Sequence, residues 1–277
     1  LKEKKEFLLV PFGSWYDTGN LEALKATQKT LQKISEKYKV LIMTAGTELQ
    51  LGEITQYTNK ALVKIGKKPI ISYIIDSYPE DTQFVITLGH FKEQVKDYLK
   101  IVYPKKNIKL VEVDKYKGPG SSQLYSMLSA KNELQSPFIY HACDTITNDK
   151  IPLPQKNWIA GFKGEDSARY ASFDEIDNRV VKFFGKGAIG KDFIHVGLVG
   201  MKDYYGFWQE AQELLKNNQN QTGLGDINVI NKLLEKGIDF EALPLKSWHD
   251  TGNLESLKKA REEIEDAFHI LDKLEES

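Results

Sequence analysis

A glycine-containing loop after a predicted strand is the first feature of the sequence that could do chemistry, by holding a phosphate group. The loop runs Thr44-Ala-Gly-Thr-Glu-Leu-Gln-Leu-Gly-Glu-Ile-Thr55. In such loops the backbone N–H groups and the end of the following helix point at the anion. The loop is neither a P-loop, which needs Gly-Lys-Ser/Thr, nor a Rossmann Gly-x-Gly-x-x-Gly. Lys60 follows it and would be a single cation able to reach a phosphate oxygen; the alternative is an ordinary solvated lysine.

A second candidate feature is a fifteen-residue segment that occurs twice. Residues 11–25 and 244–258 match at eleven of fifteen positions, with an offset of 233 residues. Stacked repeats recur at about 20–50 residues, so this offset excludes a solenoid. In each copy the Asn of Asp-Thr-Gly-Asn is positioned to cap a helix. Two interpretations stay open. The element is a duplicated strand–turn–helix used for packing, or its Asp17 or Asp250 lies at the end of a strand, where α/β sheets place ligands.

Alternating strands and helices in the first half of the chain must position these segments. Their βαβα order predicts an α/β fold with a mostly parallel sheet and helices on both faces. The predicted strands are 38–44, 84–88, 108–113 and 138–143, and the predicted helices are 69–78, 91–100 and 121–134.

From Trp158 the pattern changes to consecutive short strands, which predict a small antiparallel insert beside the sheet. No linker rich in Pro, Gly or Ser divides the chain, so we expect one domain, 39–277, with an appended N-terminal element, 1–38. The short strands are 158–162, 168–173 and 179–184, followed by a strand at 193–200 and helices at 204–215 and 226–236.

Composition and charge exclude several classes of protein. The 277 residues carry 38 basic and 39 acidic side chains, a net charge of −1, which argues against a nucleic-acid partner. The single cysteine, Cys143, excludes an internal disulfide framework and a cysteine-rich metal site. No run of about 18 apolar residues could insert into a membrane, and the first residues are not apolar enough for a signal peptide. We therefore expect a cytoplasmic protein.

The first residue bears on how the chain is organised. It is Leu1 rather than Met, so we expect a piece of a longer protein. Together with the duplicated segment, this makes residues 1–38 look like the tail of a preceding module in a tandem or fused chain.

Taken in order, these segments resemble the sugar-nucleotide pyrophosphorylases and related NTP-transferases, which are nucleotidyltransferases with a GT-A-like Rossmann core. The resemblance covers about residues 39–260, and the form Gly-Pro-Gly-Ser-Ser is similar to the capsule and surface-polysaccharide branch. The matching segments are Ala45-Gly46, Leu51-Gly52 with Thr55, Lys60-Ala-Leu-Val, Gly66-Lys-Lys-Pro69, Gly118-Pro-Gly-Ser-Ser122, Asp144, Val196-Gly197 and Trp248-His-Asp-Thr-Gly252.

The resemblance implies an enzyme that joins a nucleoside triphosphate to a phosphorylated acceptor, usually a sugar 1-phosphate, and releases pyrophosphate. It implies Mg²⁺ held by Asp144 and Asp250, because hard Mg²⁺ takes one or two carboxylates together with phosphate oxygens. Lys60 matches a lysine that contacts phosphate, and Lys186 roughly matches one that holds the acceptor phosphate. The nucleotide would lie against Ala45, Gly46, Thr47, Gly118 and Ser121.

The signature loop departs from the family pattern Ala-Gly-x-Gly-Thr/Ser-Arg-Leu-Gly. The three middle positions are Glu48, Leu49 and Gln50. Gln50 stands at the position of the arginine that clamps the triphosphate, a planar and permanently charged group. Glu48 adds a carboxylate that would repel the triphosphate. Moreover, no arginine occurs in the first 168 residues.

Several functions therefore stay open. The first is a working nucleotidyltransferase in which Lys60, Lys64 or Lys67 replaces the arginine. The second is a catalytically impaired nucleotidyltransferase-like module that serves binding or assembly. A GT-A glycosyltransferase ranks last, because it needs an Asp-x-Asp metal motif that Asp144-Thr-Ile lacks. We expect Asp250 rather than Asp17 to complete the site; a permuted or swapped arrangement is the alternative.

Overall fold

The computed structural model describes residues 19–27, 38–47, 50–164, 169–218 and 221–275, with side chains described up to residue 265. The chain divides into two compact units, residues 1–37 and 38–277. In the first unit residues 21–27 are helical. The Asn20 side chain accepts a hydrogen bond from Ala23 N at 2.8 Å, so the predicted cap is confirmed. Asp17, Glu48 and Leu49 lie outside the described residues.

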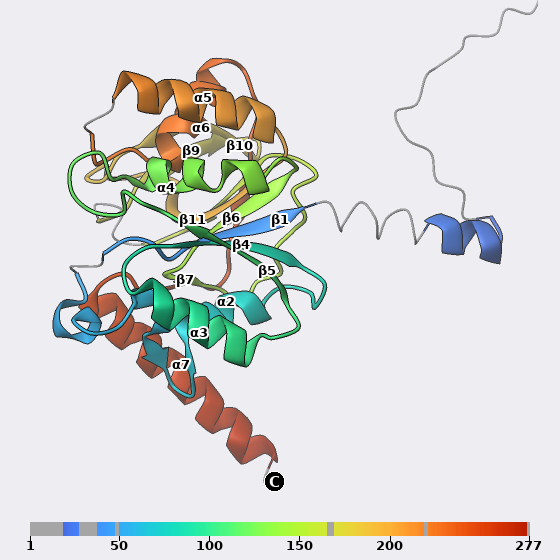
Figure 1. Ribbon diagram of the computed structural model, residues 1–277. Coiled ribbons are helices and arrows are strands. Elements are labelled where there is room, and N and C mark those ends of the chain that lie inside the picture. Colours follow the sequence, from blue (N-terminus) through green and yellow to red (C-terminus); the bar gives the residue numbers. More distant parts are fainter. Residues whose placement is uncertain (1–18, 28–37, 48–49, 165–168, 219–220, 276–277) are drawn as a thin grey trace, which may run out of the picture. The chain divides into compact units, whose positions relative to one another are not determined.

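A nine-stranded sheet forms the centre of the second unit (Figure 1). From one edge to the other its strands are β5 (Asn107–Glu112), β4 (Gln83–Leu88), β1 (Lys39–Met43), β6 (Phe138–Ala142), β11 (Phe193–Met201), β8 (Trp158–Phe162), β12 (Glu241–Pro244), β10 (Arg179–Phe184) and β9 (Ser172–Ile176).

The sheet is mixed, which corrects the expectation of a mostly parallel one. Strands β5, β4, β1 and β6 are parallel, as the βαβα order predicts. Strand β11 then pairs antiparallel with both β6 and β8, and only β12 and β8 are parallel beyond that point. An apolar run identifies a strand but does not fix its direction, which depends on pairings distant in sequence. The strands of the predicted insert do not lie beside the sheet: β8, β10 and β9 are all part of it, and β9 and β10 pair antiparallel as expected.

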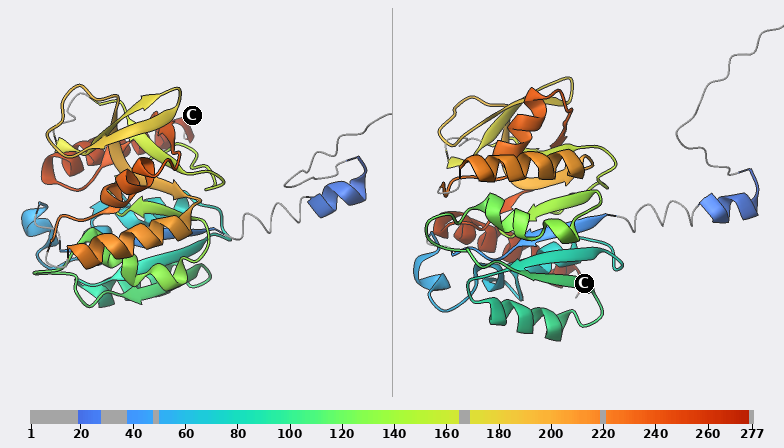
Figure 2. Two further views of the ribbon diagram at one scale, coloured as in Figure 1. Left: turned by 90° about the horizontal axis from the view of Figure 1, so that it is seen from above. Right: turned by 45° about the horizontal axis from the view of Figure 1, so that its top comes forward.

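Helices cover both faces of the sheet (Figures 1 and 2). The predicted helix at 121–134 is shorter than expected and is followed by a 3₁₀ turn, η3 (Lys131–Glu133). Helix α4 begins where Ser122 Oγ accepts a hydrogen bond from Tyr125 N at 3.0 Å. One face carries α2 (Ile70–Asp76), α3 (Lys92–Val102) and α7 (Leu254–Glu275), and the other carries α4 (Gln123–Ser129), α5 (Tyr204–Asn217) and α6 (Asp226–Glu235).

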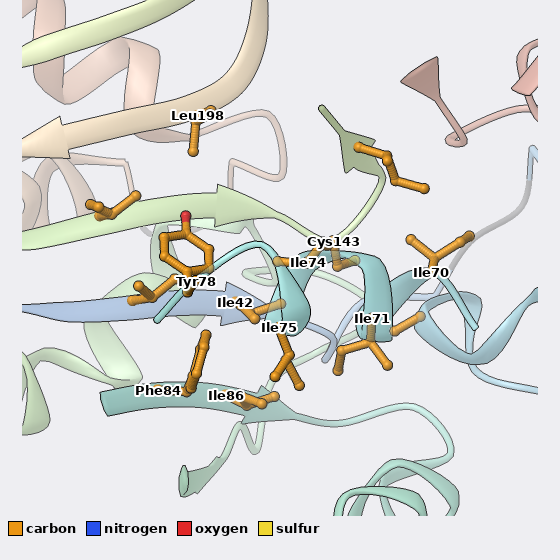
Figure 3. Close-up of a cluster of buried hydrophobic side chains, with 14 of the residues drawn as sticks. Ile42, Ile70, Ile71, Ile74, Ile75, Tyr78, Phe84, Ile86, Cys143 and Leu198 are labelled. Carbon is orange, nitrogen blue, oxygen red and sulfur yellow. The ribbon is translucent and has the colours of Figure 1, made fainter. Parts of the chain in front are cut away.

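Strand alternation divides the core into two layers, one on each face of the sheet. In β1, Val40 and Ile42 pack with the layer under α2, whereas Leu41 points to the opposite layer. Figure 3 shows the first layer, in which isoleucines of α2 lie against Ile42, Phe84 and other strand residues. Burial on both faces fixes the register of the central strands and therefore the positions of their carboxyl ends.

Two small sheets and, besides η3, two further short 3₁₀ turns lie outside the main sheet among the described residues. Strands β7 (Thr145–Ile146) and β13 (His249–Asp250) pair antiparallel, and so do β2 (Lys64–Ile65) and β3 (Lys68–Pro69). The 3₁₀ turns are η1 (Gly52–Thr55) and η2 (Lys60–Leu62). Across the described part of the chain, no helix combines the length and apolarity needed to cross a membrane.

Candidate active site

The phosphate-loop candidate is held by a buried asparagine at its base. Asn59, 1% exposed, donates hydrogen bonds from Nδ2 to the carbonyls of Thr44 at 2.9 Å and His90 at 2.7 Å. His90 N in turn donates to the Ala45 carbonyl at 2.8 Å. A Cβ on Gly89 would lie 2.5 Å from that carbonyl, so only glycine permits this close approach. These contacts fix the segment that leaves β1 against the end of β4.

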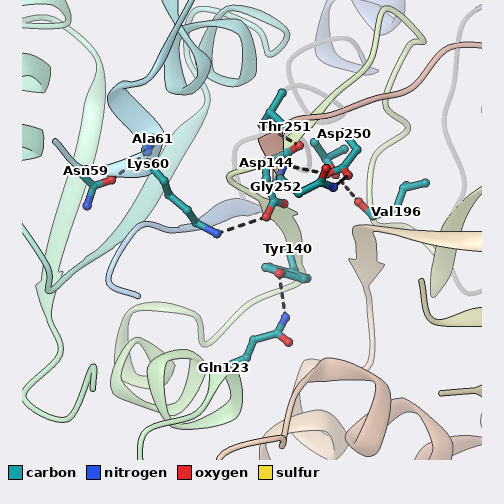
Figure 4. Close-up of polar contacts among 12 residues, drawn as sticks. Asn59, Lys60, Ala61, Gln123, Tyr140, Asp144, Val196, Asp250, Thr251 and Gly252 are labelled. Carbon is teal, nitrogen blue, oxygen red and sulfur yellow. Dashed lines mark hydrogen bonds and ion pairs between the residues drawn. The ribbon is translucent and has the colours of Figure 1, made fainter. Parts of the chain in front are cut away.

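The same asparagine positions Lys60. Asn59 Oδ1 accepts a hydrogen bond from Ala61 N at 2.9 Å and so caps η2, whose first residue is Lys60. The lysine Nζ lies 3.2 Å from Asp144 Oδ2 (Figure 4). The two side chains are 18% and 31% exposed, so the pair is partly shielded from solvent. Lys60 is therefore a directed cation at the end of β6, not a solvated lysine.

Two segments about one hundred residues apart bring Asp144 and Asp250 together. Asp250 pairs with Thr145 in the β7–β13 ladder. Thr251 then donates to the Asp144 carbonyl from both its backbone N, at 2.9 Å, and its Oγ1, at 3.0 Å. A Cβ on Gly252 would lie 3.1 Å from Asp250 Oδ1 and 3.3 Å from Asp144 Oδ2, so both carboxylates flank this glycine. The structure thus juxtaposes the two residues predicted as metal ligands.

Hydrogen bonds orient the Asp250 carboxylate. Its Oδ1 accepts from Gly252 N at 2.9 Å, and its Oδ2 accepts from Tyr170 Oη at 2.8 Å and Asn253 Nδ2 at 3.1 Å. Burial, followed by the nearby Asp250 charge, raises the pKa of Tyr170 to about 12. The phenol therefore keeps its proton and remains a donor at neutral pH. Asn253 also caps α7, since its Oδ1 accepts from Ser256 N at 3.0 Å, which confirms the second predicted cap.

A buried histidine of β6, His141, contacts the backbone of the residue that follows Asp144. His141 Nε2 lies 3.0 Å from the Thr145 carbonyl, and Nδ1 lies 2.9 Å from Tyr78 Oη. Because a carbonyl only accepts, Nε2 donates and Nδ1 accepts from the phenol, which is the neutral tautomer. Burial lowers the pKa of His141 to about 4.

A cavity of about 420 Å³ lies between the loop and the end of β6, and we call it the nucleotide cavity. Six predicted residues line it, together with Tyr116, Gln123 and Tyr140. Gly118 is not among the lining residues; its carbonyl accepts hydrogen bonds from Ser121 N and Oγ at 3.1 and 2.7 Å, and it has a left-handed φ of +79°. The predicted residues in the lining are Ala45, Gly46, Thr47, Lys60, Ser121 and Asp144.

A second cavity, of about 680 Å³, adjoins the first at Asp144 and Gln123, and we call it the acceptor cavity. Its lining includes the other predicted residues, Gln50, Lys186 and Asp250. Tyr170 and Trp248 pack edge to face in its wall, with ring centroids 5.1 Å apart. Of all the predicted residues, Asp144 alone lines both cavities.

The donor set fits Mg²⁺ only if a phosphate completes it. Among the described residues, no group of three or more His, Cys, Asp or Glu side chains could hold a metal ion. Asp144 and Asp250 nevertheless supply two hard oxygen donors beside Gly252. Mg²⁺ is commonly bound by one or two carboxylates together with substrate phosphates and water.

Several residues that position the site were not predicted from the sequence. Asn59, Tyr170 and the buried polar residues around Gln123 have roles that depend on contacts distant in sequence. A signal was available for Asn59 alone, because an Asn directly before a short turn is a common cap.

The fold of residues 38–277 is similar to that of solved nucleotidyltransferases. CTP:phosphocholine cytidylyltransferase from Streptococcus pneumoniae superposes with a TM-score of 0.71 at 22% identity, covering 82% of this chain and 99% of that one. A UDP-glucose pyrophosphorylase complexed with UDP-glucose gives 0.69 at 16% identity, covering 83% and 99%. Because the sequence identities are this low, the superpositions show a similar fold and nothing about activity.

Sequence relatives belong to the same broad class. Choline-phosphate cytidylyltransferase of Streptococcus pneumoniae is 36% identical over 106 residues, which are 38% of this chain and 44% of that protein. The bifunctional protein GlmU of Methanococcus maripaludis is 24% identical over 222 residues, 77% of this chain and 51% of that protein. The matched regions thus span about half the length of these relatives. No protein-family model matches the chain.

Proposed function

We propose that this chain transfers a nucleoside monophosphate from an NTP to a phosphorylated small-molecule acceptor, a sugar 1-phosphate or a similar compound, and releases pyrophosphate. The observation that carries the proposal is the position of Asp144, which lines both cavities with Lys60 on one side and Asp250 on the other. The relatives are named as enzymes of this type and lend no support to a catalytically impaired module. The Gly-Pro-Gly-Ser-Ser segment at 118–122 supports placement in the surface-polysaccharide branch.

In this proposal the reaction takes place where the two cavities meet. An oxygen of the acceptor phosphate attacks the α-phosphorus of the NTP, and the bond from that phosphorus to the bridging oxygen breaks. Pyrophosphate leaves with the electron pair, so the protein acts mainly by alignment and charge neutralisation. Lys60 would contact the nucleotide phosphates and Lys186 the acceptor phosphate, while Gln50 offers a neutral donor where the family has arginine.

Mg²⁺ would be held by Asp144 and Asp250 together with phosphate oxygens. When bound, it neutralises charge on the phosphates and helps to align them. Tyr170 and Asn253 would keep the Asp250 carboxylate oriented toward this position.

The test is pyrophosphate release with each NTP and Mg²⁺, with and without glucose 1-phosphate, inositol 1-phosphate or phosphocholine. We expect release that needs both the acceptor and Mg²⁺, and that falls by at least about a hundredfold in Asp144→Asn. Asp76→Asn is the matched control, because Asp76 forms an exposed pair with Lys68 on another part of the surface. Acceptor-independent release, or equal loss in both variants, would contradict the proposal.

A further inference from the structure

An aspartate outside both cavities connects the two segments that carry the predicted metal ligands. Asp149 follows Asp144 on the same segment and is not among the described residues that line the nucleotide cavity or the acceptor cavity. Its Oδ2 accepts hydrogen bonds from the backbone N–H groups of Lys246 and Ser247, each at 2.8 Å. Hydrogen bonds to a carboxylate are charge-assisted and stronger than those between neutral groups. Asp149 therefore anchors the segment that leads to Asp250.

Further side-chain bonds strengthen the same connection. Thr147 Oγ1 donates to the Ser247 carbonyl at 2.8 Å and accepts from Asp149 N at 3.0 Å. Asn148 N donates to Ser247 Oγ at 2.9 Å. Burial by itself would raise the pKa of Asp149, but the bonds from the Ser247 and Lys246 backbone lower it below its ordinary value. The side chain is therefore an ionised acceptor at neutral pH.

The connection matters because the strand pairing beside it is short. Strands β7 and β13 are two residues long, and one of their residue pairs joins Asp250 to Thr145. An isolated two-stranded ladder is marginally stable at best in water. At one end this ladder is held by Thr251, which donates twice to the Asp144 carbonyl (Figure 4). At the other end it is held by the bonds of Asp149.

We propose that Asp149 is a positioning residue for the metal site: it holds Ser247, sets the register of β13 on β7 and thereby places the Asp250 carboxylate beside Asp144. The inference rests on the proposed function and adds a residue that acts through Asp250 and touches neither substrate nor metal. Ser247 precedes Asp250 by three residues, so a shift of Ser247 is carried along the short strand to the carboxylate. A displacement of about 1 Å at a catalytic site can cost on the order of a hundredfold in rate.

Three variants separate this role from an ordinary contribution to folding. Asp149→Ala removes every bond to the carboxylate, whereas Asp149→Asn keeps a neutral oxygen that can still accept. Asp203→Ala is the matched control, because Asp203 Oδ2 accepts a bond from the buried Asn157 at 2.7 Å and lies outside the described linings of both cavities. Calorimetry measures the Kd for NTP with and without Mg²⁺, and kinetics measures the Mg²⁺ concentration that gives half-maximal pyrophosphate release. Denaturant titration measures the free energy of unfolding.

We expect Asp149→Ala to raise the Kd for NTP in the presence of Mg²⁺, and the half-maximal Mg²⁺ concentration, by about tenfold or more. The Kd for NTP without Mg²⁺ should not change, and Asp149→Asn should recover part of the loss. Asp203→Ala should lose stability but keep the Mg²⁺ dependence of the wild-type protein. A contribution to folding alone would give both alanine variants the same Mg²⁺ dependence.

The inference is overturned if Asp149→Ala has the Mg²⁺ dependence of the wild-type protein, or if it loses NTP binding equally with and without Mg²⁺. Should Asp149→Ala fail to fold, Asp149→Asn and Ser247→Ala take its place, and an unchanged Mg²⁺ dependence in both would overturn the inference. Mg²⁺-dependent NTP binding that weakens in the Asp149 variants, without pyrophosphate release in the wild-type protein, would instead overturn the proposed function and leave the inference standing.

Discussion

Lys60 Nζ lies 3.2 Å from Asp144 Oδ2, at the point where the two cavities of the site meet. The lysine comes from a 3₁₀ turn capped by Asn59, and the aspartate follows the central strand β6, 84 residues further along the chain. The ion pair therefore joins η2, which follows the phosphate-loop candidate, to the metal-site candidate, and it is the contact on which the proposed chemistry depends.

Replacing Lys60 by Ala should lower the rate of nucleotidyl transfer by about 10²- to 10³-fold, because a preorganised cation facing the phosphates is lost. Lys60→Arg should retain part of the activity, since it keeps the charge. Lys64→Ala is the control: Lys64 is exposed and is not among the residues that line either cavity. Steady-state kinetics with saturating Mg²⁺ checks the result. A similar loss in the Lys64 variant would mean that a diffuse basic surface is responsible.

The two copies of Asp-Thr-Gly should differ in function. Asp250→Ala should weaken Mg²⁺-dependent NTP binding by at least about tenfold, because one of two hard oxygen donors is lost. The Asp17→Ala variant should bind NTP in the presence of Mg²⁺ with the same affinity as the wild-type protein. Calorimetric titration of each variant with NTP, with and without Mg²⁺, measures the difference. Equal losses in the two variants would reverse the assignment in favour of a swapped arrangement.

A substitution at Gly252 tests whether the positions of the Asp144 and Asp250 carboxylates matter for Mg²⁺–NTP binding. In Gly252→Ala the new methyl group would lie 3.1 Å from Asp250 Oδ1 and 3.3 Å from Asp144 Oδ2, so one or both carboxylates must shift. We expect Mg²⁺–NTP affinity to fall on the order of tenfold while the protein stays folded. Gly223→Ala is the matched control, because a methyl group there meets open space. Unchanged affinity in Gly252→Ala would place the metal elsewhere.

Stability should fall in mildly acid solution because of His141. Burial lowers the pKa of this histidine from 6.5 to about 4 in the folded protein. Between these values the unfolded chain binds the additional proton, so the contribution is complete above pH 6.5 and is lost as pH falls toward 4. The loss amounts to about 3 kcal/mol in the free energy of unfolding. Denaturant titrations from pH 7 to pH 4 should show this decrease in the wild-type protein and a smaller one in His141→Gln; identical pH profiles would contradict it.

The altered signature loop can be restored. Changing Glu48, Leu49 and Gln50 to Gly, Ser and Arg removes a carboxylate and adds a planar cation for the triphosphate. We expect the Kd for NTP to fall by about tenfold or more, measured by calorimetry. Gln50→Lys alone should give an intermediate value. If none of these changes affects NTP binding, the loop does not contact the triphosphate.

The sequence predicted most of the strands and both asparagine caps, because these depend on local patterns. Six residues that line the nucleotide cavity were named from the family resemblance, whereas Gly118, named with them, does not line it. Asn20 and Asn253 follow Asp-Thr-Gly, and each accepts the expected backbone hydrogen bond. The antiparallel course of β11 could not be predicted, because strand direction depends on long-range pairing. The His195–Asp226 contact joins residues 31 positions apart on different elements, and no local pattern indicates it.

The most direct test of the account follows the α-phosphate of the nucleotide. The protein is incubated with Mg²⁺, an NTP labelled in the α-phosphate and a phosphorylated small-molecule acceptor, and the products are separated. We predict that the label appears in a nucleotidyl–acceptor product, in equal amount to released pyrophosphate, and that Asp144→Asn abolishes both. Label that stays in NTP, or that appears only as free nucleoside monophosphate, would contradict nucleotidyl transfer by this chain.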